Sequence, residues 1–468
     1  MDLLQPKSRR DFLKTSGIAT LGFLGLQNWV YRPKTLSPND FKNGPGYGPL
    51  LPDPKGILNL PEGFHYKIIS KRGDKMNDGF FVPGAADGMA AFQGKKGRVI
   101  LVRNHELNPD KLASSPFGAN NELLSKIDPA KVYDIGRKKL PALGGTTTIV
   151  YNPKTGEVEN QFLSLSGTVR NCAGGPTPWN SWLTCEESTL KTGAFDGSLE
   201  KDHGYVFEVP ATEKIQLADP VPLKSMGRFY REAVAVAPRT SIVYQTEDLG
   251  DGLIYRFIPN TPRQLFKGGK LQALAVKGQK GCDTRNWEKL PPPYFPINTP
   301  VEVEWIDLEN VESPEDNLRY QGFEKGAARF ARAEGAWFGK NEAYFACTNG
   351  GRISSGQVFK YTPSPYEGTA REKDSPGKLE LFVESKDQTI LKYCDNLTVA
   401  PWGDVVLCED HAHLFVVGIT PKGEYYKLAE NTGYESEFAG GVFSPDGQTY
   451  FVNIQGPGLT FAITGPWK

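Results

Sequence analysis

The chain lacks an excess of either charge, a dense set of cysteines and any long stretch rich in alanine, leucine and glutamate. Its 54 basic and 54 acidic residues balance, which argues against a general binder of nucleic acid or of membrane surfaces. Six cysteines in 468 residues are too few for a fold held together by disulfides. Glycine (51 residues) and proline (36 residues) are abundant instead, which favours short strands joined by many turns.

Several catalytic signatures are missing as well. No G-x-S-x-G nucleophile elbow occurs, which argues against a serine hydrolase of that type. No Walker-type phosphate loop or dinucleotide-binding glycine fingerprint stands out. With only five histidines, a zinc site built from histidines is not expected.

The N-terminus reads as an export signal. Ser8 to Lys14 (SRRDFLK) matches the twin-arginine pattern, and the mildly apolar stretch from Ile18 to Val30 is shorter than the ~20 residues of a membrane span. We therefore expect the twin-arginine export machinery to carry the chain to the periplasm or the extracellular space. No clear cleavage site follows, so retention at the membrane by an uncleaved leader stays open, as does a chance Arg-Arg pair before a core helix. The route exports folded proteins with their cofactors inserted, which is consistent with a bound metal.

Three regions are predicted along the chain. Residues 1–30 form the signal segment, and the Pro/Gly-rich residues 31–60 form a linker or a strap along the surface. Residues 61–468 form a single β-propeller domain.

An internal repeat determines the predicted fold. A small or polar start, an apolar strand, a turn, a second apolar strand and a polar or acidic end recur six times, at 87–106, 171–187, 231–248, 333–349, 395–410 and 439–453. Most copies are followed by a further apolar strand. This pattern predicts an all-β fold, a six-bladed β-propeller with long inter-strand insertions such as 107–140 and 260–325. A β-sandwich built from similar hairpins is the alternative.

The hairpin geometry predicts a cluster of polar side chains. In an antiparallel hairpin the start of the first strand lies beside the end of the second, and in a propeller all such ends meet at one end of the central channel. The starts carry Asp87, Cys172, Glu232, Glu334, Asn396 and Gly440. The ends carry Asn104, Glu106, Glu186, Glu187, Glu247, Asp248, Asn349, Glu409, Asp410 and Asn453. So many carboxylates repel one another unless cations lie between them, although a single acid at a strand end is usually a solvated cap.

The residue types indicate which ions would bind. Carboxylates and amides without a histidine triad favour Ca²⁺, Mg²⁺ or Mn²⁺, whereas the thiolate of Cys172 would favour iron or zinc at one position. Cys172 as a small buried packing residue is the alternative, and Cys185, Cys347 and Cys408 are expected to pack in the core. Arg332, two residues before Glu334, would lie at the channel mouth and suits a phosphate group. Arg103 and Arg231 occupy comparable positions, and for each arginine the alternative is charge balance with the acids.

In combination, six runs resemble the PhoX family of bacterial alkaline phosphatases, over roughly residues 45–468. They are Arg103-Asn104-His105-Glu106, Asn171-Cys172-Ala173-Gly174-Gly175, Thr184-Cys185-Glu186-Glu187, Tyr230-Arg231-Glu232-Ala233, Arg332-Ala333-Glu334-Gly335 and Asp395-Asn396-Leu397. The twin-arginine leader agrees with the resemblance. It implies a six-bladed propeller whose channel holds a mixed cluster of Fe³⁺ and Ca²⁺ ions and hydrolyses phosphate monoesters outside the cytoplasm.

The resemblance also implies roles for individual residues. Cys172 would be an iron ligand, Glu232 and Glu334 metal ligands, and Arg332 and Asn104 would hold phosphate. The predicted catalytic residues are thus Arg332, Asn104 and Glu334. Further predicted ligands, without a named ion, are Glu106, Glu186, Glu187, Glu247, Asn396 and Glu409. We expect the ions and Arg332 to stabilise the charge on the phosphoryl oxygens, with no side-chain nucleophile.

Two other functions stay open. One is a calcium-dependent propeller lactonase or phosphotriesterase, and the other is a non-enzymatic propeller whose ions only tie the blades together. The expected partner is a small-molecule phosphate ester, and no nucleic acid. Because a closed propeller needs no partner to cover its sheet edges, we expect a monomer.

Overall fold

The computed structural model describes residues 45–468, and the fold is built by the compact unit Pro49–Lys468. The unit is almost entirely β-structure. Its helices are α2 (Ala194–Gly197), α3 (Leu318–Lys325) and short 3-10 turns of three residues each. Among the described residues, no helix has the length and apolar character needed to cross a membrane.

The strands form five hydrogen-bonded sheets. The first two sheets are β4 (Ala86–Gln93), β5 (Val99–His105), β6 (Gly144–Asn152) and β7 (Glu157–Thr168), and β8 (Asn171–Pro176), β9 (Ser181–Glu186) and β10 (Val206–Pro210). The third has nine strands: β11 (Arg231–Val236), β12 (Val243–Glu247), β13 (Ile254–Pro259), β14 (Gly269–Val276), β15 (Val301–Asp307), β19 (Lys378–Glu384), β18 (Gln357–Thr362), β17 (Ala343–Cys347) and β16 (Ala333–Phe338). The fourth is β20 (Cys394–Val399), β21 (Val405–Glu409), β22 (Phe415–Ile419), β23 (Tyr425–Asn431), β2 (Leu58–Pro61) and β1 (Leu50–Leu51), and the fifth is β24 (Phe438–Phe443), β25 (Tyr450–Ile454), β26 (Leu459–Thr464) and β3 (His65–Lys71).

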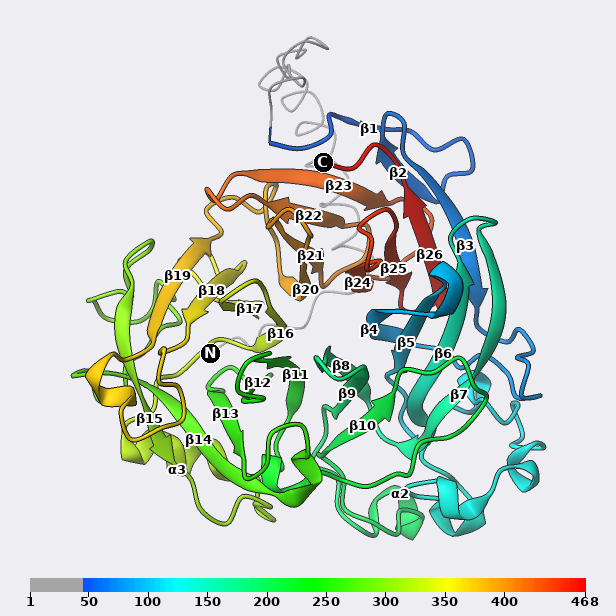
Figure 1. The fold of residues 1–468 in the computed structure, drawn as a ribbon, viewed down its shortest axis with the longest axis horizontal. Helices are drawn as coiled ribbons and strands as arrows, with labels where there is room; N and C mark the ends of the chain where they lie inside the picture. Colours follow the sequence, from blue (N-terminus) through cyan, green and yellow to red (C-terminus); the bar gives the residue numbers. More distant parts are fainter. Residues whose placement is uncertain (1–44) are drawn as a thin grey trace, which may run out of the picture. The chain divides into compact units, whose positions relative to one another are not determined.

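The centre of the unit is surrounded by β4, β8, β11, β16, β20 and β24 (Figure 1). Each of them contacts the next one in this order, and β24 contacts β4, so the inner strands close a ring. From each inner strand the chain proceeds outward through antiparallel neighbours. The prediction of an all-β propeller is therefore confirmed in its general form, a propeller-like fold.

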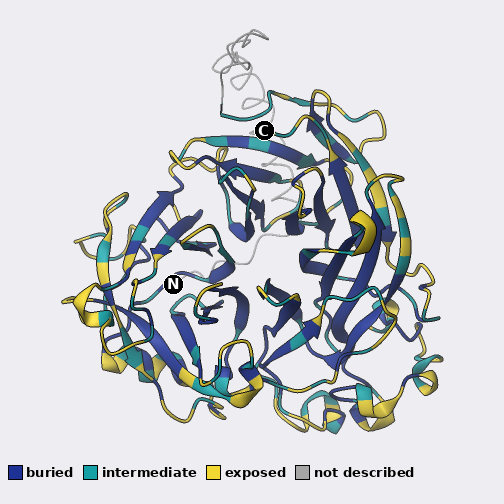
Figure 2. Ribbon diagram, in the orientation of Figure 1, coloured by how far each residue is buried: buried dark blue, intermediate teal, exposed yellow. Residues whose placement is uncertain are grey.

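The apolar core lies between neighbouring sheets. Buried strands dominate the interior, and exposed residues gather in the peripheral loops (Figure 2). Met89 and Leu101 of the first sheet, for example, pack with Val442 and Phe451 of the fifth. Strands such as Val-Ile-Leu-Val (99–102) are apolar on both faces because each sheet packs against two others.

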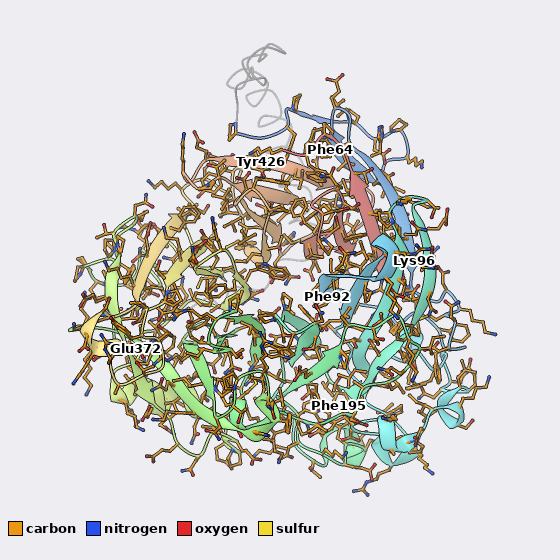
Figure 3. The ribbon with its side chains drawn as sticks, in the orientation of Figure 1. Phe64, Phe92, Lys96, Phe195, Glu372 and Tyr426 are labelled. Atoms are coloured by element: carbon orange, nitrogen blue, oxygen red, sulfur yellow. The ribbon has the colours of Figure 1, made fainter. Side chains whose placement is uncertain are left out.

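The nine-stranded sheet departs from the expected separate blades. It consists of two four-stranded meanders, β11–β14 and β16–β19, and β15 pairs with β19 through only Val301 and Glu302. A buried ion pair also joins the two meanders. Arg256 of β13 lies 2.7 Å from Glu367 and contacts Glu372, which lies near the periphery of the unit (Figure 3). The hydrogen-bonded sheets thus number five and not six.

Both ends of the described chain complete sheets. β3 adds to β26, so an N-terminal strand closes the sheet that holds the C-terminal strands. β2 pairs with β23 and β1 pairs with β2, and all of their residues but Pro61 lie in the range predicted as a linker or strap. The predicted signal segment lies outside the described residues, and the predicted domain boundaries stay predictions.

One irregularity recurs in all six inner strands. Each pairs with the following strand, and in each the register shifts across two unpaired residues, which is the pattern of a β-bulge. The second bulge residue is small in most cases because the inner strands approach closely. A Cβ added at Gly88 would lie 2.5 Å from the Ala173 Cα, and one at Gly335 would lie 2.4 Å from the Asp395 carbonyl oxygen. The bulges therefore allow tight packing around the centre and change the direction of their first residue.

Candidate functional site

The first residue of each bulge supplies the centre of the candidate site. In chain order these residues are Asp87, Cys172, Glu232, Glu334, Asp395 and Gly440. Five of the six carry a carboxyl or a thiol, and all five are buried or nearly so. A bulge commonly re-aims a side chain beside an active site, and here the same device is used around the whole ring.

A second set of acids follows the second strand of four hairpins. Its members are Glu106, Glu187, Asp248 and Asp410, and each donates its backbone N–H to the carbonyl of the residue two positions before a bulge, at 2.8–3.0 Å. This shared hydrogen bond shows that the four acids occupy equivalent positions. They therefore lie beside the bulge residues, at the same end of the inner strands.

Cys172 lies where two groups of potential metal ligands meet. Its Sγ and one carboxylate oxygen each from Asp87 and Glu106 lie within 4.8 Å of one another, and so do its Sγ and oxygens of Glu187 and Glu232. The thiol donates to Glu187 Oε2 at 3.0 Å. These residues come from β4, β8 and β11 and the ends of β5 and β9, so the fold brings together groups far apart in sequence.

The electrostatics of this cluster are unfavourable without a counter-ion. Burial, followed by the neighbouring carboxylates, raises the pKa of Glu232 and of Glu334 well above the ordinary range. Burial likewise raises the pKa of Cys172, with Glu106 and Glu187 adding to the effect. For Glu187 burial outweighs the favourable charge of Arg170, and its pKa is about 7. The carboxylates and the thiolate can be ionised together only if cations neutralise them.

The donor set fits metal ions of two kinds. Carboxylate oxygens suit hard cations such as Ca²⁺, and the single thiolate suits a softer metal or iron. Neither group of potential ligands among the described residues contains a histidine. Both ring nitrogens of His105 are occupied, by the Gly84 carbonyl and the Thr147 hydroxyl. Gln455 positions two of the acids, since its Nε2 donates to Asp87 at 2.9 Å and to Glu106 at 2.8 Å.

Arg332 lies at the rim of the cluster, as the sequence predicts. Its Nε and Nη2 donate to Asp248 at 2.9 and 3.1 Å, and its Nη2 lies 2.6 Å from Glu334 Oε1. Its Nη1 lies 3.6 Å from Asp410. The side chain is partly exposed, so a guanidinium at the mouth is held by carboxylates beneath it.

Three predicted ligands have other partners in the structure, and their assignment as ligands stays a prediction. Glu186, Glu247 and Glu409 end the second strands, one residue before the acids of the cluster, and alternation turns them into the sheets. Glu186 accepts from the N–H groups of Val169, Gly204 and Tyr205 and contacts His203; Glu247 accepts from Leu253 N–H and the Tyr255 hydroxyl; Glu409 accepts from the N–H groups of Lys392 and Phe415. These buried carboxylates tie loops to strands.

The side chains of two predicted site amides, Asn104 and Asn396, hydrogen-bond to backbone groups and to neighbouring side chains. Asn104, assigned to phosphate binding, donates to the carbonyls of Cys172 and Ala173 and accepts from Trp182 and Thr184, so its side chain is fully used. Asn396, assigned as a ligand, accepts from Gly440 N–H at 2.5 Å and donates to Asp395 at 3.0 Å.

Two predicted arginines do not reach the rim. The guanidinium of Arg103 is buried against Thr147 and Thr460, and that of Arg231 donates to Gln245 and to backbone carbonyls. The expected core packing of Cys185, Cys347 and Cys408 is confirmed, since all three are buried free thiols.

Sequence reasoning missed four residues of the site. Asp395, and not Asn396, is the residue equivalent to Glu334, and the two carboxyls interact directly. Arg170 is equivalent to Arg332, a match that alignment of the repeats on Cys172 and Glu334 would have revealed. Glu437 interacts with Asp410, and burial and this contact raise the pKa of Glu437 to about 9. Gln455 and Glu437 carry no signal in the repeat, because they surround the glycine bulge at Gly440.

Comparison with known proteins gives the following matches. The model of the family described as alkaline phosphatase PhoX matches residues 45–458. The structure of Pseudomonas fluorescens PhoX in complex with vanadate, a transition state analogue, is 16% identical, and the match covers 90% of this chain and 98% of that chain with a TM-score of 0.65. At this identity the likeness shows a shared fold. A gluconolactonase of Xanthomonas campestris (11% identity, 90% and 99% coverage) has a TM-score of only 0.40 and carries no argument. No curated protein matches the chain.

The side chains of Glu186 and Glu187 point in opposite directions, so replacing each in turn gives a matched pair of variants. Glu186→Gln should cost about 2–4 kcal/mol of unfolding free energy, because buried N–H groups and His203 lose their acceptor, yet leave the metal content unchanged. Glu187→Gln should lower the metal content. In protein freed of metal by a chelator, it should lower the unfolding free energy less than Glu186→Gln does. Urea denaturation and elemental analysis of both variants check this. Loss of metal in Glu186→Gln alone would reverse the assignment.

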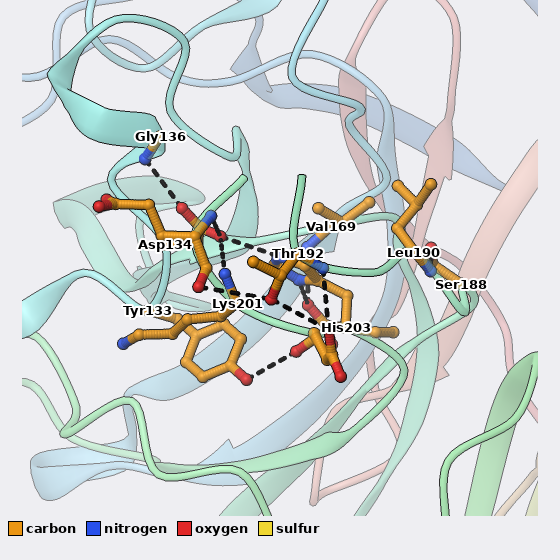
Figure 4. A network of polar contacts seen from close by, with 12 residues as sticks. Tyr133, Asp134, Gly136, Val169, Ser188, Leu190, Thr192, Lys201 and His203 are labelled. Atoms are coloured by element: carbon orange, nitrogen blue, oxygen red, sulfur yellow. Dashed lines mark hydrogen bonds and ion pairs between the residues drawn. The ribbon is translucent and has the colours of Figure 1, made fainter. Parts of the chain in front are cut away.

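His203 links Glu186 to a second buried carboxylate, Asp134, at 2.6 and 3.4 Å respectively (Figure 4). Burial disfavours the imidazolium, but Glu186 and Asp134 outweigh it and raise the pKa of His203 from 6.5 to about 9. A raised folded-state pKa means that this stabilisation is fully present below pH 6.5 and lost as the pH rises through about 9.

The unfolding free energy of the wild type should therefore fall relative to that of His203→Gln by up to about 3 kcal/mol across this interval. Urea titrations of both proteins at about pH 6 and about pH 10 measure the difference. An equal gap between the two proteins at both pH values would show that His203 is neutral in the fold.

Proposed function

Because the chain belongs to the PhoX family of alkaline phosphatases, we propose that it hydrolyses phosphate monoesters at the ring of carboxylates around Cys172. Membership of the family makes it a metal-dependent phosphoric ester hydrolase. The observation that carries the proposal is the position of Cys172, whose thiol is shared by two groups of acids within 4.8 Å. A thiol surrounded by carboxylates suits a cluster of iron and calcium ions better than calcium alone.

Five residues are proposed as the main ligands. Asp87, Glu106 and Cys172 would hold one ion, and Cys172, Glu187 and Glu232 another. Glu334, which lies beside Asp395, is proposed to extend the cluster toward Arg332. When bound, the ions would neutralise the carboxylates and polarise the phosphoryl group.

The protein's own groups would position the substrate. Asp248 holds the Nε and Nη2 of Arg332, which fixes the plane of the guanidinium toward the mouth. From there Arg332 would donate to the phosphoryl oxygens and stabilise the charge that grows on them during hydrolysis. Asn104 contributes indirectly, because its hydrogen bonds to the carbonyls of Cys172 and Ala173 fix the bulge that presents the thiol.

Several features of the whole protein belong to the same proposal. Counting each meander of the nine-stranded sheet as a blade gives six blades, which is supported by the six inner strands. Export by the twin-arginine machinery to the periplasm or beyond is supported by Ser8 to Lys14, which lies outside the described residues. A monomer is supported by the closed ring of inner strands, which turns their unpaired edges toward the centre and away from a second chain.

Elemental analysis of the purified protein, together with hydrolysis of p-nitrophenyl phosphate with and without added calcium, tests the proposal. We expect bound iron and calcium and a calcium-dependent phosphatase activity. Calcium without iron, in a protein that hydrolyses no phosphate monoester, would contradict it.

Replacement of Cys172 gives a sharper test. Cys172→Ala should remove iron and lower kcat by about 100-fold or more, because the thiolate is shared by both groups of ligands. Cys185→Ala is the matched control, since it deletes a buried thiol that faces the core, and it should keep its iron. An iron content and activity of Cys172→Ala equal to those of Cys185→Ala would remove Cys172 from the centre.

A further inference from the structure

Two arginines occupy the same position in different hairpins of the ring. Arg170 precedes Cys172 by two residues, and Arg332 precedes Glu334 by two residues. The backbone carbonyl of each accepts an equivalent hydrogen bond, from Glu187 N–H at 2.9 Å and from Thr348 N–H at 3.0 Å. Both have a left-handed backbone, with φ of 48° and 49°, which is uncommon for residues other than glycine.

The two guanidinium groups are both held through Nε and Nη2, although the acceptors of Nε differ. In Arg170, Nε donates to the Glu187 carbonyl at 3.1 Å, and Nη2 donates to the Glu187 carboxylate and lies 2.7 Å from Glu106. In Arg332, Nε and Nη2 are bound by Asp248 and Glu334. In neither arginine does Nη1 hydrogen-bond to any residue from 45 to 468, and the side chains are 36% and 33% exposed.

The two side chains flank one metal-ligand candidate. Arg170 lies at the start of β8 and Arg332 at the start of β16, and both strands contact β11, which carries Glu232. The two Nη1 groups therefore lie at the rim, on either side of the strand that presents Glu232. That of Arg170 has no hydrogen-bond partner among residues 45–468, and that of Arg332 has only the 3.6 Å ion pair with Asp410. A phosphate monoester dianion carries two negative charges and three oxygens that accept such donors.

We propose that Arg170 is a second phosphate-binding arginine, which contacts the phosphoryl oxygens from the other side of β11 than Arg332 does. This inference rests on the proposed phosphatase function. The competing role for Arg170 is neutralisation of Glu106 and Glu187, in which case its loss would disturb the metal content and not the affinity for phosphate.

The experiment compares Arg170→Gln, Arg170→Lys and Arg332→Gln with the wild-type holoenzyme. Arg98→Gln is the matched control, because Arg98 also holds one carboxylate, that of Glu159, through Nε and Nη2. It lies in the turn between β4 and β5, at the end of β5 opposite to Glu106 and the site. Three quantities are measured: the metal content, the calorimetric Kd for inorganic phosphate, and kcat and KM for p-nitrophenyl phosphate.

We expect Arg170→Gln to keep its metal content and to raise the phosphate Kd and the KM by about 10-fold or more, as Arg332→Gln does. Arg170→Lys should fall between the wild type and Arg170→Gln, since lysine keeps the charge but loses the planar fork of donors. Arg98→Gln should leave all three quantities unchanged.

The other outcomes overturn the inference. An unchanged phosphate Kd in Arg170→Gln, with Arg332→Gln impaired, would limit phosphate binding to Arg332. A loss of metal in Arg170→Gln would assign Arg170 to charge balance. A wild-type protein that neither binds phosphate nor hydrolyses p-nitrophenyl phosphate would instead contradict the proposed function itself, whatever the variants do.

Discussion

Repulsion among buried carboxylates is the constraint around which this molecule is organised. The inner strands bring Asp87, Glu232, Glu334 and Asp395 to one end of the ring, and burial raises the pKa of each. A fold gains nothing from such a cluster unless something else neutralises it. The two arginines at the rim supply part of the positive charge, and metal ions between the carboxylates and Cys172 would supply the rest. The requirement for cations therefore follows from the packing of the strands themselves.

The repeated bulge separates chemical from structural residues. It frees one residue per inner strand from the alternation of the sheet, so that an acid can point to the centre while its neighbours stay in the core. The same division appears at the strand ends, where Glu187 faces the cluster and Glu186 binds backbone N–H groups and His203. The two adjacent glutamates thus have different roles, because strand geometry turns their side chains in opposite directions.

The repeat in the sequence was sufficient to predict a propeller-like all-β fold and the convergence of Cys172, Glu232, Glu334 and Arg332. The repeat was not sufficient where a shift of one residue in register decides which side chain faces the centre. Asn396 stands next to Asp395 and either fits the pattern, but only the bulge determines which one faces the centre. The repeat also gave no indication of the partners of Asn104, which lie on a neighbouring hairpin, or of the pairing of β15 with β19, which depends on a long insertion.

The most direct test of the account is the location of metal ions by anomalous diffraction from crystals of the native protein, recorded above and below the iron edge. We expect an iron atom bound to Cys172 Sγ and further cations among Asp87, Glu106, Glu187 and Glu232. Ions bound instead at Glu186, Glu247 or Glu409, or a carboxylate ring without any cation, would contradict it.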